Sequence, residues 1–319
     1  MLPTAKHFHL EKLAEGVYAA LGTGDSPTFS NAGIVDLGDQ TLVFDAFELP
    51  EAGQELAAAA QALTGRPATY LINSHSHWDH WGGNQAFAPA VPIIAPAGTR
   101  AEMPASSNWV QRLKRDPQQL AQSIAQTRAR LETEEDERWR PSLAQTIVRQ
   151  EHMLAALDAQ IFCYPDLTFD HKLTFHGRKR LAELVVVAPA HTVCDAYLLL
   201  AAEGIAFIGD LGFFQCQPFM AFCDVAAWQA WLAEAERWPV ETFVPGHGPV
   251  GSRTDLALQR EYLRIVDEMV VQAVADGLSL DETLTLPLSP PYDAWLQGGM
   301  GRWEANVTTL YERATGDQG

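Results

Sequence analysis

Cysteine is scarce in this sequence, and its cysteines show no pairing pattern. The four that occur are Cys163, Cys194, Cys216 and Cys223, and no two of them have the C-x-x-C spacing of metal-binding or redox-active pairs. In a chain without an export signal, cysteines scattered in this way are expected to be reduced thiols. The sequence therefore predicts no disulfide framework.

Positive charge is also in short supply. Lysine and arginine number 22 against 40 aspartates and glutamates, which gives a formal net charge of -18. Proteins that bind nucleic acid need clustered lysines and arginines to contact the phosphate backbone. The sequence therefore predicts no nucleic-acid partner.

Long apolar runs are missing as well. No stretch is apolar enough for a transmembrane helix, and residues 1–7 lack the apolar core of a signal peptide. We therefore expect a soluble, cytoplasmic protein with no membrane partner. At 319 residues the chain is long enough to bury a large core.

Histidine, in contrast, is concentrated in one place. Residues 75–80 read His-Ser-His-Trp-Asp-His, so that His75, His77 and His80 lie beside Asp79. Imidazole and carboxylate groups are ligands that a zinc-like ion takes at about 2.0–2.2 Å. This cluster predicts a metal site.

The surrounding sequence indicates how the cluster is carried. The apolar run at 69–72 predicts a strand that ends just before it, and side chains two apart beyond a strand point the same way. The first two histidines can then reach one ion, while the aspartate and the third histidine, after the turn, can face a second. Gly82 and Gly83 have no side chains, so they let the backbone pass close beneath the metal ions.

Three later apolar runs lead to further ligand types. These are His191 after 184–190, Asp210 after 205–208 and His247 after 242–244. Because loops at the ends of adjacent strands converge on one rim of a sheet, we expect all three to join the first cluster. The other histidines have no such context and are expected at the surface or in packing: His7, His9, His152, His171 and His176.

The pattern of apolar runs predicts an α+β fold with two packed sheets and helices outside. Strands are expected at 17–21, 32–37, 41–45, 69–72, 91–95, 167–169, 172–175, 184–190, 196–200, 205–208 and 242–244. Helices are expected at 51–63, 225–238, 255–275 and 302–314, with two long helices and a shorter one in a segment at about 104–160. This inserted segment is either a solvated decoration or a cap over the site.

In order along the chain, these residues resemble the metallo-β-lactamase superfamily, the αββα-sandwich metallohydrolases. The similarity covers about residues 15–250. It rests on Asp45 at the end of an early strand, residues 75–80, Ala190-His191-Thr192, Gly209-Asp210 and Pro245-Gly246-His247-Gly248. The resemblance implies a four-layer αββα sandwich over residues 1–250, including the helical insertion, with residues 251–319 as a helical C-terminal extension packed on the same domain.

The resemblance also implies a ligand set. One ion would bind His75, His77 and His191, the other would bind Asp79, His80 and His247, and Asp210 would bridge them. The expected cofactors are two zinc ions, with manganese or iron as alternatives. Such a pair activates water and polarises a carbonyl, which makes Asp79 and Asp210 the expected catalytic residues, with Asp79 orienting the water or shuttling its proton.

The expected activity is hydrolysis of a small carbonyl substrate, which is an ester, lactone or thioester. Asp210 and the loop at 74–84 resemble the glyoxalase II and lactonase branch, although the helical insertion and the lack of a basic C-terminal stretch depart from glyoxalase II. Hydrolysis of a β-lactam or phosphodiester is the alternative. A di-iron redox protein and a non-catalytic binding module are two further hypotheses.

Other residues near the motifs have expected roles. Asp195 is expected to steady a ligand, and Cys194 is expected to be a buried thiol. The partner is expected to be a small molecule, anionic ones included because two dications make a pocket locally positive. A homodimer is left open. Seven residues could line an apolar pocket, although a place in the core is the default expectation for aromatic residues: Trp78, Trp81, Phe213, Phe214, Phe219, Met220 and Tyr292.

Overall fold

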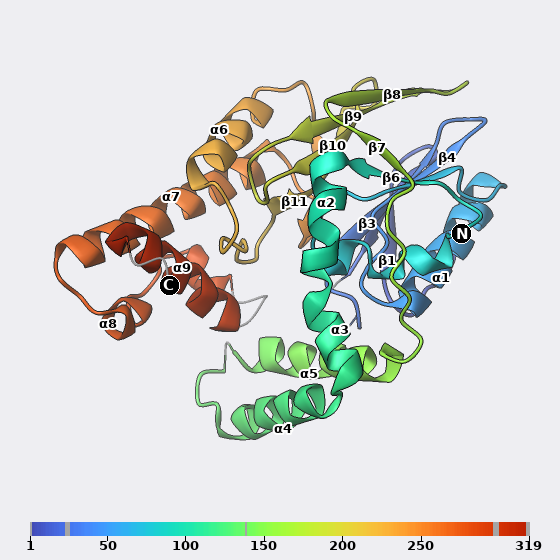
Figure 1. Cartoon of the computed structure of the whole chain (residues 1–319). Coiled ribbons are helices and arrows are strands. Elements are labelled where there is room, and N and C mark those ends of the chain that lie inside the picture. The colour runs from blue at the N-terminus through green and yellow to red at the C-terminus, as the bar shows by residue number, and fades with distance from the viewer. Residues whose placement is uncertain (1, 23–25, 138, 296–299, 317–319) are drawn as a thin grey trace.

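The first of two central sheets has seven strands (Figure 1). The computed structural model describes residues 2–22, 26–137, 139–295 and 300–316. The strands follow one another in space as in sequence: β1 (His9–Ala14), β2 (Val17–Leu21), β3 (Asn31–Asp36), β4 (Thr41–Phe44), β5 (Tyr70–Ile72), β6 (Ile93–Pro96) and β7 (Leu167–Phe169). Neighbours from β1 to β4 are antiparallel, and those from β4 to β7 are parallel.

The second sheet has five strands in the order β12-β11-β10-β9-β8. Its strands are β8 (Lys172–His176), β9 (Leu181–Val187), β10 (Asp195–Leu200), β11 (Ile205–Phe213) and β12 (Thr242–His247). The strands from β8 to β11 are antiparallel, and β12 runs parallel to β11. Each predicted strand is present.

Alternation along the strands explains how the layers pack. Val35 and Leu42 face the second sheet, where they join one core with Leu198. Their neighbours Ile34 and Val43 face the opposite way, against helix α1 (Pro50–Thr64). Because successive side chains of a strand point to opposite faces, one sheet contributes to two cores.

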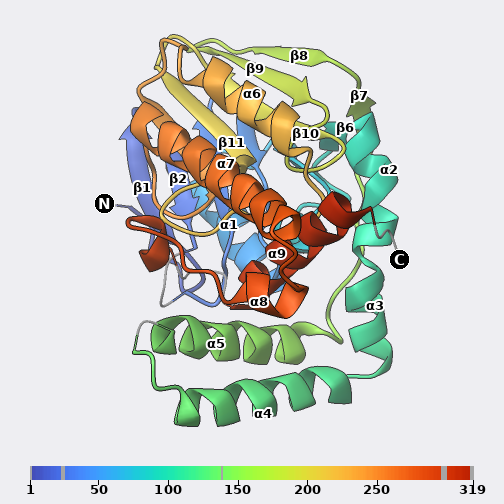
Figure 2. The same ribbon diagram turned by 90° about the vertical axis from the view of Figure 1, so that its left-hand side faces the viewer.

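Helices cover the outer face of the second sheet too. α6 (Val225–Ala235), α7 (Arg253–Ala275) and α9 (Met300–Thr315) share a buried core with β11, and the short α8 (Leu280–Leu284) packs beside α9. Figure 2 shows α6 and α7 lying across this face. The predicted four-layer αββα sandwich with a helical C-terminal extension is therefore confirmed.

The segment between β6 and β7 is helical, as predicted, but it begins earlier than expected, and its described residues form two shorter helices, not one, before the two long ones. It holds α2 (Ala97–Ser106), α3 (Asn108–Arg115), α4 (Gln118–Thr133) and α5 (Arg140–Ala156). The early start was missed because Pro104, which reads as a helix boundary, lies inside α2. In Figures 1 and 2, α4 and α5 lie side by side below the sheets.

Strand β1 was not predicted. Its residues alternate poorly, and most are exposed or half-buried because the strand forms the edge of the first sheet. None of the helices in the described part of the chain combines the length and the apolar character needed to span a bilayer.

Candidate metal centre

The loop after β5 is held in place by Asp45. The backbone nitrogen and hydroxyl of Ser74 donate to the two oxygens of Asp45 at 2.7 and 2.8 Å. Asp45 is fully buried and has a φ of 61°, a left-handed conformation that non-glycine residues seldom adopt. Further along, a Cβ at Gly82 or Gly83 would collide with the carbonyl oxygens of Glu48 and Ala46, so the chain passes there only without side chains.

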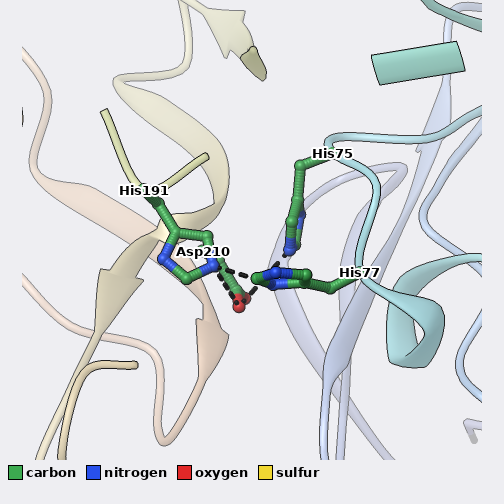
Figure 3. A group of neighbouring side chains, drawn as sticks. All are labelled: His75, His77, His191 and Asp210. Carbon is green, nitrogen blue, oxygen red and sulfur yellow. Dashed lines mark hydrogen bonds and ion pairs between the residues drawn. The ribbon is translucent and has the colours of Figure 1, made fainter. Parts of the chain in front are cut away.

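Four predicted ligands form a first group (Figure 3). His75 and His77 come from the loop after β5, and they point towards His191 and Asp210 from the second sheet. His75 Nε2 and His191 Nε2 lie 3.5 and 3.3 Å from Asp210 Oδ2, and His191 Nε2 lies 3.0 Å from His77 Nδ1.

Asp79, His80 and His247 form a second group beside it. Asp79 Oδ2 lies 3.6 Å from His80 Nε2 and 3.3 Å from His247 Nε2. Asp210 Oδ1 lies 3.0 Å from His80 Nε2 and 3.3 Å from His247 Nε2. The two oxygens of the Asp210 carboxylate thus face different groups of donors.

Hydrogen bonds on the far side of three rings fix their orientation. His80 Nδ1 lies 2.9 Å from Asp45 Oδ2, and His75 Nδ1 lies 2.9 Å from the hydroxyl of Ser74. His247 Nδ1 donates to the carbonyl oxygen of Phe29 at 3.1 Å. Each ring therefore directs its Nε2 lone pair into the site, the arrangement that holds metal-binding histidines in other proteins.

The donor atoms suit a cation. His75 Nε2, His80 Nε2 and Asp210 Oδ1 are buried, and none makes a hydrogen bond within the described residues. Buried polar atoms without partners are costly, and a cation would satisfy all three. Two ligands on one tetrahedral ion lie roughly 3.4 Å apart, which is close to the separations here.

The protonation states of His77 and Asp210 also suit a cation. Burial, reinforced by His191 and His75, holds the pKa of His77 well below its ordinary value. Burial would raise the pKa of Asp210, but His247 and His80 outweigh it and hold that pKa well below its ordinary value. At neutral pH these residues offer a free imidazole lone pair and an ionised carboxylate, which are the forms that bind metals.

The structure brings together all seven residues predicted from sequence, but it places Asp210 differently. The expected strand at 205–208 continues to Phe213, so Asp210 lies within β11 and not in a loop after it. The pairing of β11 with β12 shifts on either side of Gly209, whose φ is 51°. This irregularity turns the Asp210 side chain into the site from the middle of a strand.

The loop bearing His191 is held by Asp195. Asp195 accepts hydrogen bonds from the backbone nitrogen and hydroxyl of Thr192, the residue after the ligand, at 2.9 and 2.8 Å. Cys194 is buried against Gly98, and burial raises the pKa of its thiol. The burial of Cys194 is confirmed, whereas Asp195 holds the residue after His191 and makes no hydrogen bond with the His191 ring among the described residues.

A cavity of about 840 Å³ opens onto both groups. Trp78 and Phe219 line it, as predicted. Five other residues do not line it and are buried in the cores beneath the site, the alternative that the sequence left open: Trp81, Phe213, Phe214, Met220 and Tyr292. Helices α2, α3 and α5 contribute to the wall, so the insertion forms part of the cavity and is not only a decoration.

Several wall residues had no sequence signal. Phe29, Arg149 and Arg302 line the cavity although they belong to three separate parts of the chain. Each lies in a stretch whose local pattern is that of an ordinary loop or helix. Only the fold brings them together.

A sequence model of the metallo-beta-lactamase superfamily matches residues 25–247. This chain belongs to that superfamily. The matched range contains all seven predicted ligands, and hydrolysis is the broad activity that membership supports. No curated protein matches the sequence.

Solved structures of the superfamily have the same fold. A metallo-beta-lactamase from Pontibacter korlensis is 18% identical with a TM-score of 0.56, over 81% of this chain and 99% of its own. FIM-1 from Pseudomonas aeruginosa, in a mono-zinc form, is 15% identical with a TM-score of 0.57, over 83% of this chain and 98% of its own.

Another similar structure extends over more of this chain. The inverting sec-alkylsulfatase Pisa1 from Pseudomonas sp. is 17% identical with a TM-score of 0.67. The similarity covers 96% of this chain and 50% of the alkylsulfatase. The chain thus spans about half the length of that protein, and the likeness concerns the fold.

Proposed function

We propose that this protein is a binuclear metal-dependent hydrolase of a small carbonyl substrate, which is an ester, lactone or thioester. The observation that carries the proposal is the position of Asp210, whose Oδ1 lies 3.0 Å from His80 Nε2 while its Oδ2 lies 3.3 Å from His191 Nε2. A carboxylate that faces two donor groups at the floor of a cavity suits a bridge between two ions.

The proposed ligands of one ion are His75, His77 and His191, those of the other are Asp79, His80 and His247, and Asp210 is shared. Nitrogen and oxygen donors in this number suit zinc, with manganese or iron as alternatives. When bound, two such dications lower the pKa of a shared water towards neutrality and polarise a substrate carbonyl.

Asp79 is proposed to handle the proton of the attacking water. Its side chain lines the cavity and retains 24% of its exposure, whereas Asp210 retains 3%. Burial would raise the pKa of Asp79, but His80 and His247 hold it well below its ordinary value. An ionised carboxylate at this position accepts a hydrogen bond from water, orients it and passes its proton to the leaving group.

Replacing Asp210 with alanine tests the proposal. The wild-type protein is expected to hold about two metal ions per chain, and Asp210→Ala is expected to lose one of them and most hydrolysis, because the shared ligand is gone. Mass spectrometry of bound metals and a panel of esters, lactones and thioesters measure both effects. His152→Ala is the control, since His152 is exposed on α5. Equal metal content and activity in the two variants would refute the assignment.

Hydrolysis of a sulfate ester is a second candidate. The similarity to the alkylsulfatase covers 96% of the present chain. It therefore includes helices outside residues 25–247, the range that the superfamily model matches. An alkyl sulfate therefore belongs in the substrate panel, together with a β-lactam and a phosphodiester. If the protein hydrolyses one of these three compounds and none of the esters, lactones or thioesters, that compound class is the substrate and the carbonyl assignment is wrong.

A reducing, cytoplasmic location is also proposed. All four cysteines are unpaired, and burial raises the pKa of the Cys216 and Cys223 thiols to about 12. Protonated buried thiols persist where glutathione keeps cysteines reduced. Thiol titration of denatured protein, purified without reductant from its natural source, should find all four thiols free, and a disulfide would contradict the proposal.

A further inference from the structure

Two arginines stand close to the candidate metal centre, on elements outside the motif loops. The Cζ atoms of Arg149, on α5, and Arg302, on α9, lie 4.1 and 4.9 Å from the centroid of the Phe29 ring. That ring in turn lies 4.3 Å from the ring of His247. Both guanidinium groups line the cavity, and a single aromatic ring separates them from a proposed metal ligand.

Arg302 has only neutral partners at close range. Its Nη1 donates to the carbonyl oxygen of Gln217 at 2.9 Å, and its Cζ lies 5.4 Å from the Phe213 ring. Among the residues that the structure describes, Arg302 forms no ion pair, although Asp210 and Asp79 attract its charge from further away. Burial lowers the pKa of Arg302, but a guanidinium keeps its charge at neutral pH. An enclosed cation of this kind is stabilised by an incoming anion.

Arg149 is only partly neutralised. Its Nε lies 3.6 Å from Glu48 Oε1, and within the described chain neither Arg149 Nε nor Glu48 Oε2 makes a hydrogen bond. Burial raises the pKa of Glu48. The Arg149 side chain keeps 30% of its exposure and lines the cavity, so the rest of its guanidinium can meet a ligand there.

Large aromatic side chains lie at exposed positions of the cavity wall. Phe222 and Trp109 line it although they are 64% and 41% exposed, and the Phe219 ring lies 5.7 Å from that of Phe222. Large exposed aromatic side chains that gather at a cavity commonly mark a binding surface. The cavity wall thus combines exposed aromatic side chains with the guanidinium groups of Arg149 and Arg302, in a protein with a net charge of -18.

From this combination we propose that the substrate carries a carboxylate a few bonds from the scissile carbonyl, and that Arg149 and Arg302 bind this carboxylate. An apolar part of the substrate is bound by Phe219, Phe222 and Trp109. The planar guanidinium matches a carboxylate with two parallel hydrogen bonds. This inference rests on the proposed hydrolase function and narrows its substrate class to anionic, amphiphilic esters, lactones or thioesters.

Binding of a matched pair of probes tests the arginines without turnover. Calorimetry with the metal-loaded protein compares 4-phenylbutyrate with 4-phenylbutyramide, which has the same shape and no charge. The acid is expected to bind at least about tenfold more tightly than the amide, and Arg149→Met and Arg302→Met are each expected to remove most of that preference.

Further variants distinguish the arginines from other effects. Arg128→Met is the control, because Arg128 is exposed and pairs with Glu151 away from the cavity. Arg302→Lys retains charge and length, so it should recover part of the preference even if Arg302→Met folds poorly. Equal binding of acid and amide by the wild type would overturn the proposal. The proposal would also be overturned if both methionine variants still preferred the acid to the amide, because the acid would then be binding the metals.

A second arm follows hydrolysis. The wild type is expected to cleave mono-4-nitrophenyl glutarate with a kcat/KM at least about tenfold above that of its methyl ester, and Arg302→Met should bring the two rates together. If neither ester is cleaved while acid binding depends on the arginines, the hydrolase proposal fails and the anion site stands. Equal cleavage of both esters by the wild type leaves the hydrolase standing and overturns the anion site. Arginine-dependent binding of octyl sulfate alone overturns the choice of a carboxylate.

Discussion

At the scale of single residues, Asp45 positions the ligand loop of the candidate metal centre, although its side chain does not line the cavity. Its carboxylate accepts from Ser74 at the base of the loop and contacts His80 Nδ1 at 2.9 Å. The sequence singled out Asp45 through its place at a strand end in the superfamily pattern. The structure supplies its physical role, which is to fix the His80 ring and the start of the loop together.

Replacing Asp45 with asparagine should therefore weaken metal binding. Asparagine is nearly the same size but lacks the charge that orients the His80 ring, so the affinity for zinc is expected to fall by about 10- to 100-fold. A competition titration against a chromogenic chelator measures the change. Asp158→Asn, at an exposed position on the insertion, should leave the affinity unchanged. An unaltered affinity in Asp45→Asn would contradict the role given to this carboxylate.

At the scale of the elements, Asp36 at the end of β3 forms ion pairs with residues of two turns that are distant in sequence. The Asp36 carboxylate accepts from Arg66 Nη1, after α1, at 2.5 Å and from Lys179 Nζ, between β8 and β9, at 2.8 Å. Burial would raise the pKa of Asp36, but Lys179, the backbone nitrogen of Gly38 and Arg66 outweigh it and lower that pKa. The interaction links the first sheet to the second.

Asp36→Asn should destabilise the protein at neutral pH and not in acid. Because the pKa is lower in the folded chain, the ionised carboxylate contributes stability above the unfolded pKa of about 3.9, and this contribution is lost as the pH falls through the folded pKa. The expected loss at pH 7 is about 1–2 kcal/mol, and it should shrink as the pH falls below the unfolded pKa. Urea unfolding at several pH values measures it, with the exposed Asp39→Asn as control. A loss that does not vary with pH would contradict the charge-based account.

The insertion is anchored to the metal loop by Trp81. This ring is fully buried in the core formed with Met103, Val110 and Ile147, and its Nε1 donates to the carbonyl oxygen of Ser76 at 2.8 Å. The sequence suggested Trp81 for the pocket because of its position beside the ligands. The structure instead uses it to join the helices to the loop.

Trp81→Ala should increase local unfolding of α4 and α5 more than local unfolding of the sheets. The expected loss of stability is about 3–5 kcal/mol, because the cavity left behind lies between the loop and these helices. Hydrogen exchange followed by mass spectrometry should show faster exchange in α4 and α5 than in β10 to β12. Trp238→Ala, on the far side of the second sheet, is the matched control. The same exchange pattern in both variants would disprove the local effect.

For the whole molecule, metal binding should contribute strongly to stability. The ligands come from both sheets, so ions that bind the folded chain alone stabilise it by about 2.7 kcal/mol at a hundredfold excess over Kd. Thermal unfolding should therefore occur at a higher temperature with zinc than after chelation. In Asp210→Ala the difference should be smaller, and in His152→Ala it should be unchanged. Identical unfolding temperatures with and without zinc would show that the metals do not link the sheets.

The sequence by itself determined the donor types, their order along the chain and the layered arrangement of strands and helices. It could do so because ligand chemistry belongs to individual side chains and the apolar run of a buried strand is local, as in the segment 75–80 and in β3 and β4. Only the tertiary structure decided which side chains form the cavity wall. Phe29, Arg149 and Arg302 meet through the packing of elements far apart in sequence, and no local periodicity records a contact of that kind.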